Sequence, residues 1–498
     1  MQTAGKAHCR NSRRKRSSIG HLADCTVRLG YVDSVNRIAG HLSRPLFGLK
    51  VPENHGNADG EGRQMEKKFT HVLLISIIPV LLSSCRSSPT GPHVSGNVQL
   101  SADYVTCTAV WLKITSSGQQ STAADGAYKI TRDGDTVLTG SLTGMDTLVI
   151  DTTAQPQRTY TYKGYWFVNG EVSDTSLPLQ VTTLDTTTNN WTFQSWTFGD
   201  NCGSSTLSDV AIINDTLAYA VGEIYLQDST TGQCDPQPYN LGIWNGHGWK
   251  LQKAPFYYQG QALYNPIYSL TAFGPTDVWL GTASVIHWNG ETFIPLDNSG
   301  VWGPHRIYKM WGTSSYDFYI VGDSGSVAKY DGYTWTKIES GVTSTVNDIW
   351  GMPGSTSSQP IVLATTLHNG ILSLTPKGAT SALEWPGGDI GSIWFADTNE
   401  VYVGGGGVYV KDERGWRRVY YRAGMYVDGM RGSGANNIFA VGWGLFAHFN
   451  GSSWQEYPQI ESIANLWSVA VAKDMVVAVG FTGGGPYMRG ILIVGKDN

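Results

Sequence analysis

The stretch from Ile307 to Ile338 reads IYKMWGTSSYDFYIVGDSGSVAKYDGYTWTKI, and it sets the pattern for most of the chain. It contains four short β segments, IYKMW, DFYIVG, SVAKY and TWTKI, which are rich in aromatic and β-branched residues. Gly, Ser and Asp residues lie between the segments and favour turns that end a strand. The stretch therefore predicts a unit of four antiparallel strands.

Variants of this unit recur to the C-terminus. Aligned on their first strands, the units begin at intervals of 60, 40, 39, 44, 37 and 39 residues. Their first residues are Leu207, Ile267, Ile307, Val346, Ile390, Val427 and Leu466. A four-stranded unit of about 40 residues that recurs several times is the signature of a β-propeller blade. The sequence predicts an all-β fold, with a seven-bladed β-propeller over residues 190–498.

The last unit is one strand short, because the chain ends soon after a third strand at Gly490–Gly495. The segment WTFQSWTF, Trp191 to Phe198, precedes the first unit and has the composition of a strand. We expect it to supply the missing fourth strand, because pairing the two ends of the array leaves no open sheet edge.

The repeats resemble those of bacterial seven-bladed propellers of surface and exported proteins, and the likeness covers roughly residues 190–496. It lies in the repeat pattern and brings no site with it. Asp331 and Gly332 are adjacent, whereas the sialidase Asp-box separates its Asp and Gly by one residue. The Gly-His and Trp-Asp signatures of WD repeats are also absent from the sequence.

Charge is distributed unevenly along the chain. Of the 35 Lys/Arg and 40 Asp/Glu residues, residues 86–498 hold 22 and 34, a net charge of −12. Phosphate binding requires clustered Lys and Arg. The composition therefore argues against nucleic acid as a partner.

The N-terminal region has the layout of an export signal. Residues 1–64 show no strand or helix periodicity and are interpreted as a non-native or disordered leader. Residues 65–85, MEKKFTHVLLISIIPVLLSSC, combine a charged start, an apolar run and small residues before Cys85. This is the arrangement of a secretory signal peptide.

The segment Leu82-Ser83-Ser84-Cys85 resembles the lipobox of bacterial lipoproteins. The resemblance implies lipid on Cys85, a tether over residues 86–95, and anchoring at the outer membrane or cell surface by that lipid only. The residue after Cys85 is Arg86 and not the Asp associated with inner-membrane retention, which favours the outer membrane. The alternative is a secreted protein cleaved near Ser84.

Residues 96–185 contain short strands at the spacing of a β-sandwich. The segments Cys107–Trp111, Arg132–Asp135 and Pro156–Tyr160 resemble the fibronectin type III module. The resemblance implies a tyrosine corner at Tyr160 and places Trp111 in the core between two sheets. Such a module serves as a spacer or as a contact domain.

Cys202 and Cys234 flank the first propeller unit. In an oxidising compartment they can form a disulfide, and two free thiols are the alternative. The spacing is not that of a zinc site, and we expect no metal and no cofactor. Asp277 and Asp317 recur ahead of second strands, which favours turn capping over catalysis.

The connections from fourth to first strands and from second to third strands carry the candidate ligand-binding residues, since function in propellers lies on such loops. Aromatic side chains near charged ones suit contact with sugar rings or peptides, although packing between loops is an equal alternative. The candidates are Trp302, His305, Arg306, Asp389, Tyr421, Arg422, Tyr426, Trp443, Tyr487 and Arg489.

The sequence thus predicts a monomeric propeller protein, membrane-anchored and facing the surface or the periplasm, that binds glycan or protein ligands through this loop face. No catalytic residue is assigned. The alternatives are a polysaccharide-degrading enzyme, with Asp389, His305 or Asp428 near the channel mouth, and a non-catalytic assembly scaffold.

Overall fold

The computed structural model of the chain describes residues 98–116, 126–142, 146–258, 261–354, 358–368, 370–483 and 486–497. The leader, the signal peptide with Cys85 and the tether lie outside the described residues. Among the described residues, no helix is long and apolar enough to cross a membrane.

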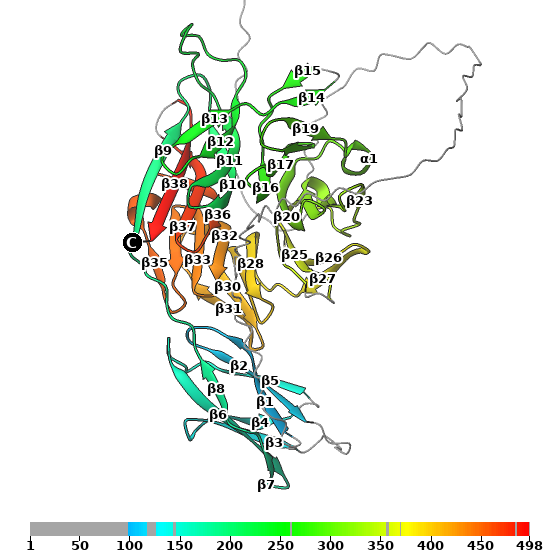
Figure 1. The fold of residues 1–498 in the computed structure, drawn as a ribbon, viewed down its shortest axis with the longest axis vertical. Helices are drawn as coiled ribbons and strands as arrows, with labels where there is room; N and C mark the ends of the chain where they lie inside the picture. Colours follow the sequence, from blue (N-terminus) through cyan, green and yellow to red (C-terminus); the bar gives the residue numbers. More distant parts are fainter. Residues whose placement is uncertain are drawn as a thin grey trace, which may run out of the picture. The chain divides into compact units, whose positions relative to one another are not determined.

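Residues 98–182 form two antiparallel sheets (Figure 1). One has the order β1-β2-β5; the other has the order β4-β3-β6-β7, with β8 also paired to β6. The strands are β1 (Val98–Val105), β2 (Val110–Ser116), β3 (Ala127–Arg132), β4 (Asp135–Ser141), β5 (Asp146–Asp151), β6 (Thr159–Val168), β7 (Glu171–Thr175) and β8 (Leu179–Thr182).

One face of each sheet contributes to a shared core. Leu112 of β2 packs in a buried cluster with Ile130 of β3 and Tyr162 of β6. Trp111 is fully buried but lies outside this cluster, and its ring contacts that of Tyr104 at 5.1 Å. Successive side chains of a strand point to opposite faces. The prediction that Trp111 fills the core between the sheets is therefore wrong, because its neighbour Leu112 takes that side of β2.

Five antiparallel sheets follow, each built from four consecutive strands in chain order. The first two contain β10 (Thr206–Asn214), β11 (Leu217–Ile224), β12 (Tyr239–Trp244) and β13 (Trp249–Gln252), then β16 (Ser269–Gly274), β17 (Asp277–Gly281), β18 (Val285–Trp288) and β19 (Phe293–Leu296). The next three contain β20 (Ile307–Ser314), β21 (Asp317–Gly322), β22 (Val327–Tyr330) and β23 (Trp335–Lys337); β24 (Val346–Met352), β25 (Ile361–Thr366), β26 (Gly370–Thr375) and β27 (Gly378–Leu383); and β28 (Ile390–Asp397), β29 (Glu400–Gly405), β30 (Gly407–Asp412) and β31 (Gly415–Tyr420).

The remaining strands form one eight-stranded sheet of order β35-β34-β33-β36-β37-β38-β9, with β32 paired to β33. Its strands are β32 (Tyr426–Gly434), β33 (Asn437–Trp443), β34 (Leu445–Phe449), β35 (Trp454–Glu456), β36 (Asn465–Val471), β37 (Met475–Thr482), β38 (Arg489–Asp497) and β9 (Trp191–Phe198).

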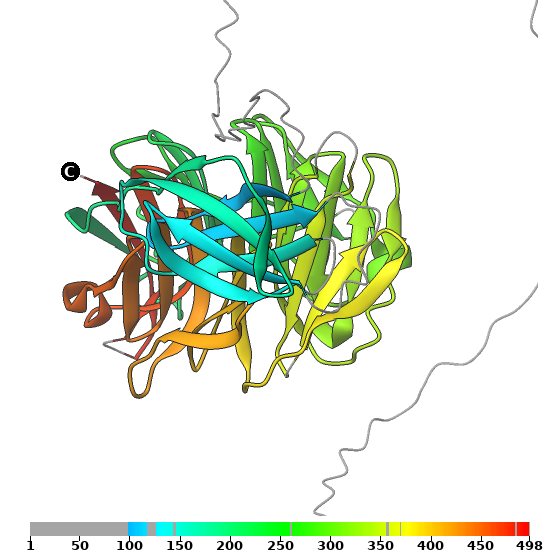
Figure 2. The ribbon, with the colours of Figure 1, turned by 90° about the horizontal axis from the view of Figure 1, so that it is seen from below.

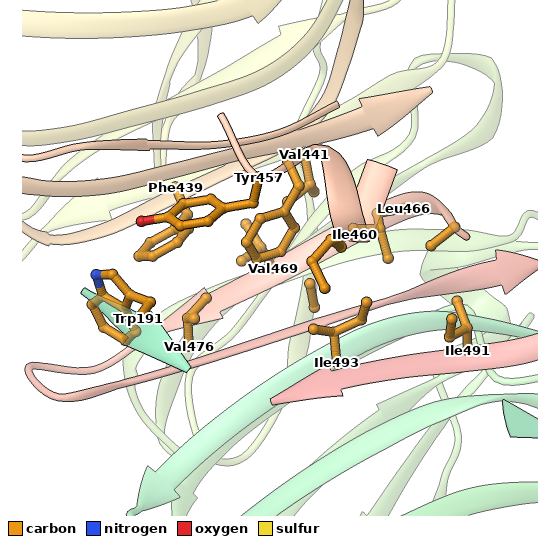
Figure 3. Close-up of a cluster of buried hydrophobic side chains, with 13 residues drawn as sticks. Trp191, Phe439, Val441, Tyr457, Ile460, Leu466, Val469, Val476, Ile491 and Ile493 are labelled. Carbon is orange, nitrogen blue, oxygen red and sulfur yellow. The ribbon is translucent and has the colours of Figure 1, made fainter. Parts of the chain in front are cut away.

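The pairing of β9 with β38 confirms the predicted closure of the array. The register runs from Trp191 opposite Asp497 to Phe198 opposite Gly490. Trp191 also packs edge-on against Phe439 of β33, with ring centroids 5.0 Å apart, inside the cluster of Figure 3. The first and last strands of the array thus share one sheet and one core.

The sheets are arranged as a β-propeller. First strands of neighbouring sheets contact one another in a closed circuit that runs β10, β16, β20, β24, β28, β32, β36 and back to β10. Figure 2 shows the sheets following one another around this circuit in sequence colours. Buried residues fill the space between sheets; Tyr319 and Val321 of β21, for example, pack with Ile349 and Val362 of the next sheet.

The turns before fourth strands have the chemistry expected for hairpins. The predicted Asn-Gly and Asp-Gly pairs place a glycine at positive φ, where other residues are strained. These glycines are Gly246, Gly290, Gly332 and Gly451, with φ between 90° and 95°.

Short additional elements occupy the connections. A two-stranded hairpin, β14 (Phe256–Tyr258) and β15 (Gln261–Leu263), lies between the first and second sheets of the array. In the described ranges the helices are α1 (Ser299–Trp302), α2 (Pro458–Glu461) and the 3₁₀ turn η1 (Asp323–Gly325).

Candidate binding face of the propeller

The loop face is the side of the propeller on which first strands begin. Antiparallel strands alternate in direction, so connections from fourth to first strands and from second to third strands lie at the same end of every sheet. Most candidate residues predicted from sequence lie in these connections. The structure adds a second set of side chains at the very start of the first strands.

A β-bulge follows the first buried residue in six of the first strands, as seen for Leu207/Asp209 and Ile307/Lys309. A bulge removes one residue from the hydrogen-bonded ladder and changes the direction of its side chain. The bulged residue differs from unit to unit, unlike the buried residue before it. The six are Ser208, Tyr308, Asn347, Gly391, Asp428 and Trp467.

One part of the loop face is built around Arg306. Its guanidinium lies 5.5 Å from the ring centroid of Tyr268 and 5.4 Å from that of Tyr308, within cation–π range. The Arg306 Nε also donates to the carboxylate of Asp323 at 3.3 Å. The cationic group is already paired, so this part of the face presents mainly tyrosine surface.

A second part contains a carboxylate without a partner. Asp428 Oδ2 is buried and accepts no hydrogen bond from the described residues. Burial raises the pKa of this carboxyl from 3.8 to about 7. Burial, together with Asp428 and Asp389, raises the pKa of the neighbouring Tyr426 to about 12. This part of the loop face therefore contains a hydrogen-bond acceptor that lacks a donor.

Exposed aromatic rings lie on two strands that adjoin β32, the strand of Asp428: Trp467 is the bulged residue of β36, and Trp443 ends β33. Trp467 is 50% exposed and Trp443 is 57% exposed. Both contact the ring of Phe481, at centroid distances of 5.7 and 5.9 Å. We call Trp443, Phe481 and Trp467 the aromatic surface. Large rings left in water in this way are typical of binding sites.

Trp302 does not reach the surface of the loop face. It is 3% exposed, packs in the core beside Ile307 and donates from Nε1 to the carbonyl of His305 at 2.7 Å. It therefore supports the loop that carries His305, which is half-buried, and Arg306, which is exposed. Trp302 leaves no ring surface for a ligand and is removed from the candidate set.

Arg422 likewise serves the fold. Its Nη1 lies 3.0 Å from Glu456 and 2.8 Å from Glu461, and Nη2 donates to the carbonyl of Gly444. These contacts tie the connection before β32 to β35 and α2. Arg422 therefore has a structural role, and its side chain remains 37% exposed.

The other predicted residues remain at the surface. Tyr421 is exposed beneath the guanidinium of Arg418, and Asp389 is exposed and contacts Nδ1 of His368 at 3.2 Å. Tyr426 and Trp443 lie opposite each other in the β32–β33 ladder. Tyr487 and Arg489 are exposed beside the connection from β37 to β38.

Sequence reasoning missed Tyr268, Tyr308, Trp467 and Phe481. Tyr268, Tyr308 and Trp467 lie at or next to the start of first strands, and Phe481 lies near the end of the second strand β37, whereas most of the predicted residues lie in loops. The signal was nevertheless present in the aligned units, because the residue directly after each buried first residue varies in size and charge. That variation marks a position the fold does not specify.

Below the loop face, two ion pairs cross the channel. Lys309 Nζ lies 2.5 Å from Asp209 Oδ1, and Arg431 Nη2 lies 2.6 Å from Asp348 Oδ1. Each pair joins first strands that are not neighbours in the circuit. Burial alone would raise the pKa of the Asp348 carboxyl. The Arg431 guanidinium stabilises its charged form and holds the pKa below its usual value. These ion pairs link sheets across the channel, and their four charged groups are paired with one another.

Part of the loop face is bordered by insertions of the first unit. Cys202 and Cys234 form a disulfide that ties the connection between β11 and β12 to the segment before β10. Lys253 then links this connection to the next one, through an ion pair with Asp235 at 2.5 Å and a cation–π contact with Tyr264.

The carboxylates of Asp277 and Asp317 are engaged by other side chains of the propeller. Asp277 accepts from Trp279 Nε1 and contacts His287 Nε2, both at 2.9 Å, and Asp317 pairs with Lys329 at 2.6 Å. In the part of the chain that the structure describes, no group of three or more His, Cys, Asp or Glu side chains is placed to hold a metal ion.

Fold and face together define an all-β protein of the β-propeller class. No family model matches the chain, and no curated protein matches it. Among solved structures, a chain of YCF48 bound to D1 peptide aligns with a TM-score of 0.46 at 12% identity, covering 63% of this chain and 98% of that one.

Two further solved structures are similar to the chain. The WD40 β-propeller domain of Doa1 aligns with a TM-score of 0.45 at 11% identity, covering 61% of this chain and 97% of that one. YCF48 from Cyanidioschyzon merolae aligns with a TM-score of 0.42 at 12% identity, covering 60% and 98%.

Proposed function

We propose that this chain is an exported, lipid-anchored protein whose seven-bladed propeller binds a segment of a partner protein through the loop face. The blade number rests on dividing the eight-stranded sheet at its weakest point. A single residue pair, Trp443 with Asn465, joins β33 to β36. Division there leaves β32–β35 as one blade and β36, β37, β38 and β9 as another.

The N-terminal sheets are proposed as a fibronectin type III-like module that acts as a spacer. The hydroxyl of Tyr160 accepts a hydrogen bond from the backbone N–H of Gln155 at 2.9 Å. This is the upstream backbone contact that a tyrosine corner makes. The split into a three-stranded and a five-stranded sheet supports the same assignment.

The observation that carries the binding proposal is the aromatic surface. Burying a tryptophan ring contributes more hydrophobic free energy than burying most other side chains, so two half-exposed tryptophans leave a large contribution available to a partner. Two tryptophans that share one buried phenylalanine form a continuous apolar patch. A patch of this kind suits the apolar side chains of a peptide or a protein loop.

Asp428 adds a polar requirement to the same face. The carboxyl group is half-buried, and a lysine, an arginine or a backbone N–H of a bound segment would stabilise its charge from the exposed side. In this proposal the aromatic surface provides affinity, while Asp428 selects segments that place a donor beside it.

The test begins with random peptides displayed on phage and selected against the full-length protein. Enriched peptides are then measured by calorimetry with wild type, with a Trp443→Ala/Trp467→Ala double variant, and with Tyr333→Ala as a matched control. Tyr333 is 89% exposed in a turn before a fourth strand, at the opposite end of its sheet. We expect the double variant to lose at least tenfold in affinity and the control to lose none.

Two outcomes would contradict this function. Selected peptides that bind the double variant as tightly as wild type would place the contact elsewhere. Release of products from a panel of polysaccharides, abolished by Asp389→Asn or Asp428→Asn, would instead make the protein an enzyme.

The anchor is tested separately. Cells expressing wild type or Cys85→Ser are labelled with a clickable fatty acid, and membrane and soluble fractions are compared. Wild type should carry the label and sediment with membranes, and the variant should carry none. Equal labelling of the two would remove the lipid anchor.

A further inference from the structure

A cavity of about 310 Å³ lies between the turn that joins β1 to β2 and the sheet β28–β31. Thr108 and Thr152 line one side, and Glu400, Arg414 and Arg417 line the other. The volume is at the lower end of the range for small-molecule sites, which is about 300–1,000 Å³. It is far from the loop face, at the other end of the sheets.

Direct hydrogen bonds hold the two sides of the cavity together. Asn399 Nδ2 donates to Asp103 Oδ2, and Asn436 Nδ2 donates to the carbonyl of Asp185, both at 2.8 Å. Polar contacts outside the cavity therefore join its two walls.

Glu400 supplies an acceptor that the fold does not satisfy well. It is only 9% exposed, and among the described residues its carboxylate accepts one hydrogen bond, a long one of 3.4 Å from the hydroxyl of Tyr402. Burial, followed by the nearby Asp412 carboxylate, raises the pKa of this carboxyl to about 7. A buried carboxylate with one weak partner is costly.

Arg417 supplies a donor in the same wall. Its Nη2 lies 2.6 Å from Asp412 and its Nε is buried, so its Nη1 group is the donor left for a ligand in the cavity. Arg414 Nη2 also contacts Asp412, at 2.5 Å. Above pH 7, where Glu400 is ionised, the two arginines, Asp412 and Glu400 sum to zero charge, so the wall is then polar without a net charge.

These properties select the kind of molecule that fits. A charged ligand would leave an uncompensated charge in a neutral, partly buried wall. Hydroxyl groups both donate and accept, so they satisfy an under-used carboxylate and an under-used guanidinium together. The threonine hydroxyls of the opposite side have the same dual capacity.

We propose that this cavity binds a neutral polyhydroxylated ligand of about one monosaccharide unit. Glu400 accepts from ligand hydroxyls, while Arg414 and Arg417 donate to them. Thr108 and Thr152 complete the site from the N-terminal module. The site is separate from the loop face and does not depend on the function proposed for that face.

The experiment uses the full-length protein and saturation-transfer NMR, with affinity measured by calorimetry. The probes are glucose, galactose, mannose and N-acetylglucosamine, together with the charged analogues glucuronate and glucosamine. We expect at least one neutral sugar to bind saturably and more tightly than the charged analogues. Absence of saturable binding for every neutral sugar, or equal binding of its charged analogue, would overturn the proposal.

Variants then locate the site. Glu400→Gln should weaken binding of that sugar about tenfold, and Thr108→Val should weaken it several-fold. Glu339→Gln, in an exposed Lys337 ion pair, is the matched control and should change nothing. Because Glu400→Gln can affect folding, Thr108→Val decides the matter if the first variant unfolds. Unchanged affinity in Thr108→Val would refute the site, as would loss of sugar binding in Trp443→Ala/Trp467→Ala.

Discussion

Replacing Asp428 by Asn is expected to stabilise the propeller at neutral pH. The carboxyl has a pKa of about 7 in the folded protein, against 3.8 for an ordinary aspartate, because it is buried without a partner. At a pH between these two pKa values, the Asp428 carboxyl is ionised in the unfolded chain and protonated in the folded chain. Stability therefore falls as the pH rises through this window.

The magnitude follows from the two pKa values. Each pH unit between them lowers the free energy of unfolding by about 1.4 kcal/mol, so the interval from 3.8 to about 7 corresponds to about 4 kcal/mol. Asn has nearly the same shape and no charge to titrate. The variant should match wild type near pH 4 and exceed it by a few kcal/mol above pH 7.

Urea unfolding followed by tryptophan fluorescence measures this difference at a series of pH values. The informative quantity is the gap between variant and wild type, since other groups titrate equally in both. A gap that does not grow between pH 4 and pH 7 would refute the reasoning. A growing gap would show that the fold tolerates an unfavourable carboxylate, as binding sites commonly do.

Three further outcomes are expected. Arg431→Ala should lower the free energy of unfolding by about 3–5 kcal/mol, because it leaves Asp348 buried and unpaired; adding Asp348→Asn should restore part of that loss in the same urea assay. Cys202→Ser should cost about 3–4 kcal/mol, the chain-entropy value for a loop of 32 residues, and should be seen as a lower melting temperature. Deleting residues 190–199 should remove most of the cooperative melting seen by circular dichroism, and an unaltered melt would contradict the role of β9.

Much of the propeller could be predicted because its units repeat. The strand boundaries of one unit alone are ambiguous. Comparison of repeated units shows which positions are buried and which lie in turns. The pairing of β9 with β38 followed from counting strands, since an unpaired last sheet is unfavourable. In the N-terminal module nothing repeats, and β7 could not be predicted: Glu171–Thr175 is a polar segment without strand alternation, and it is held by pairing with β6.

The candidate site was harder to predict than the fold. Sequence alone does not distinguish a loop tryptophan that faces solvent from one that packs in the core. Trp302 is a core residue. A first-strand residue such as Trp467 reads as part of the sheet until the bulge is known. The ion pairs of Arg422 could not be predicted, because its partners Glu456 and Glu461 are distant in sequence. All three cases depend on side-chain direction, which local sequence does not specify.

The pairing of β9 with β38 also determines the order in which the protein can fold. Thr192 and Lys496, which meet in this ladder, are 304 residues apart. The ring therefore cannot close until nearly the whole propeller has been synthesised, and bringing such distant segments together is slow. Until then β9 and β38 are both open edges that can pair with other chains. Only a chain that includes β38 can close the ring. A chain truncated before Arg489 would keep its sheet edges exposed and be prone to aggregate.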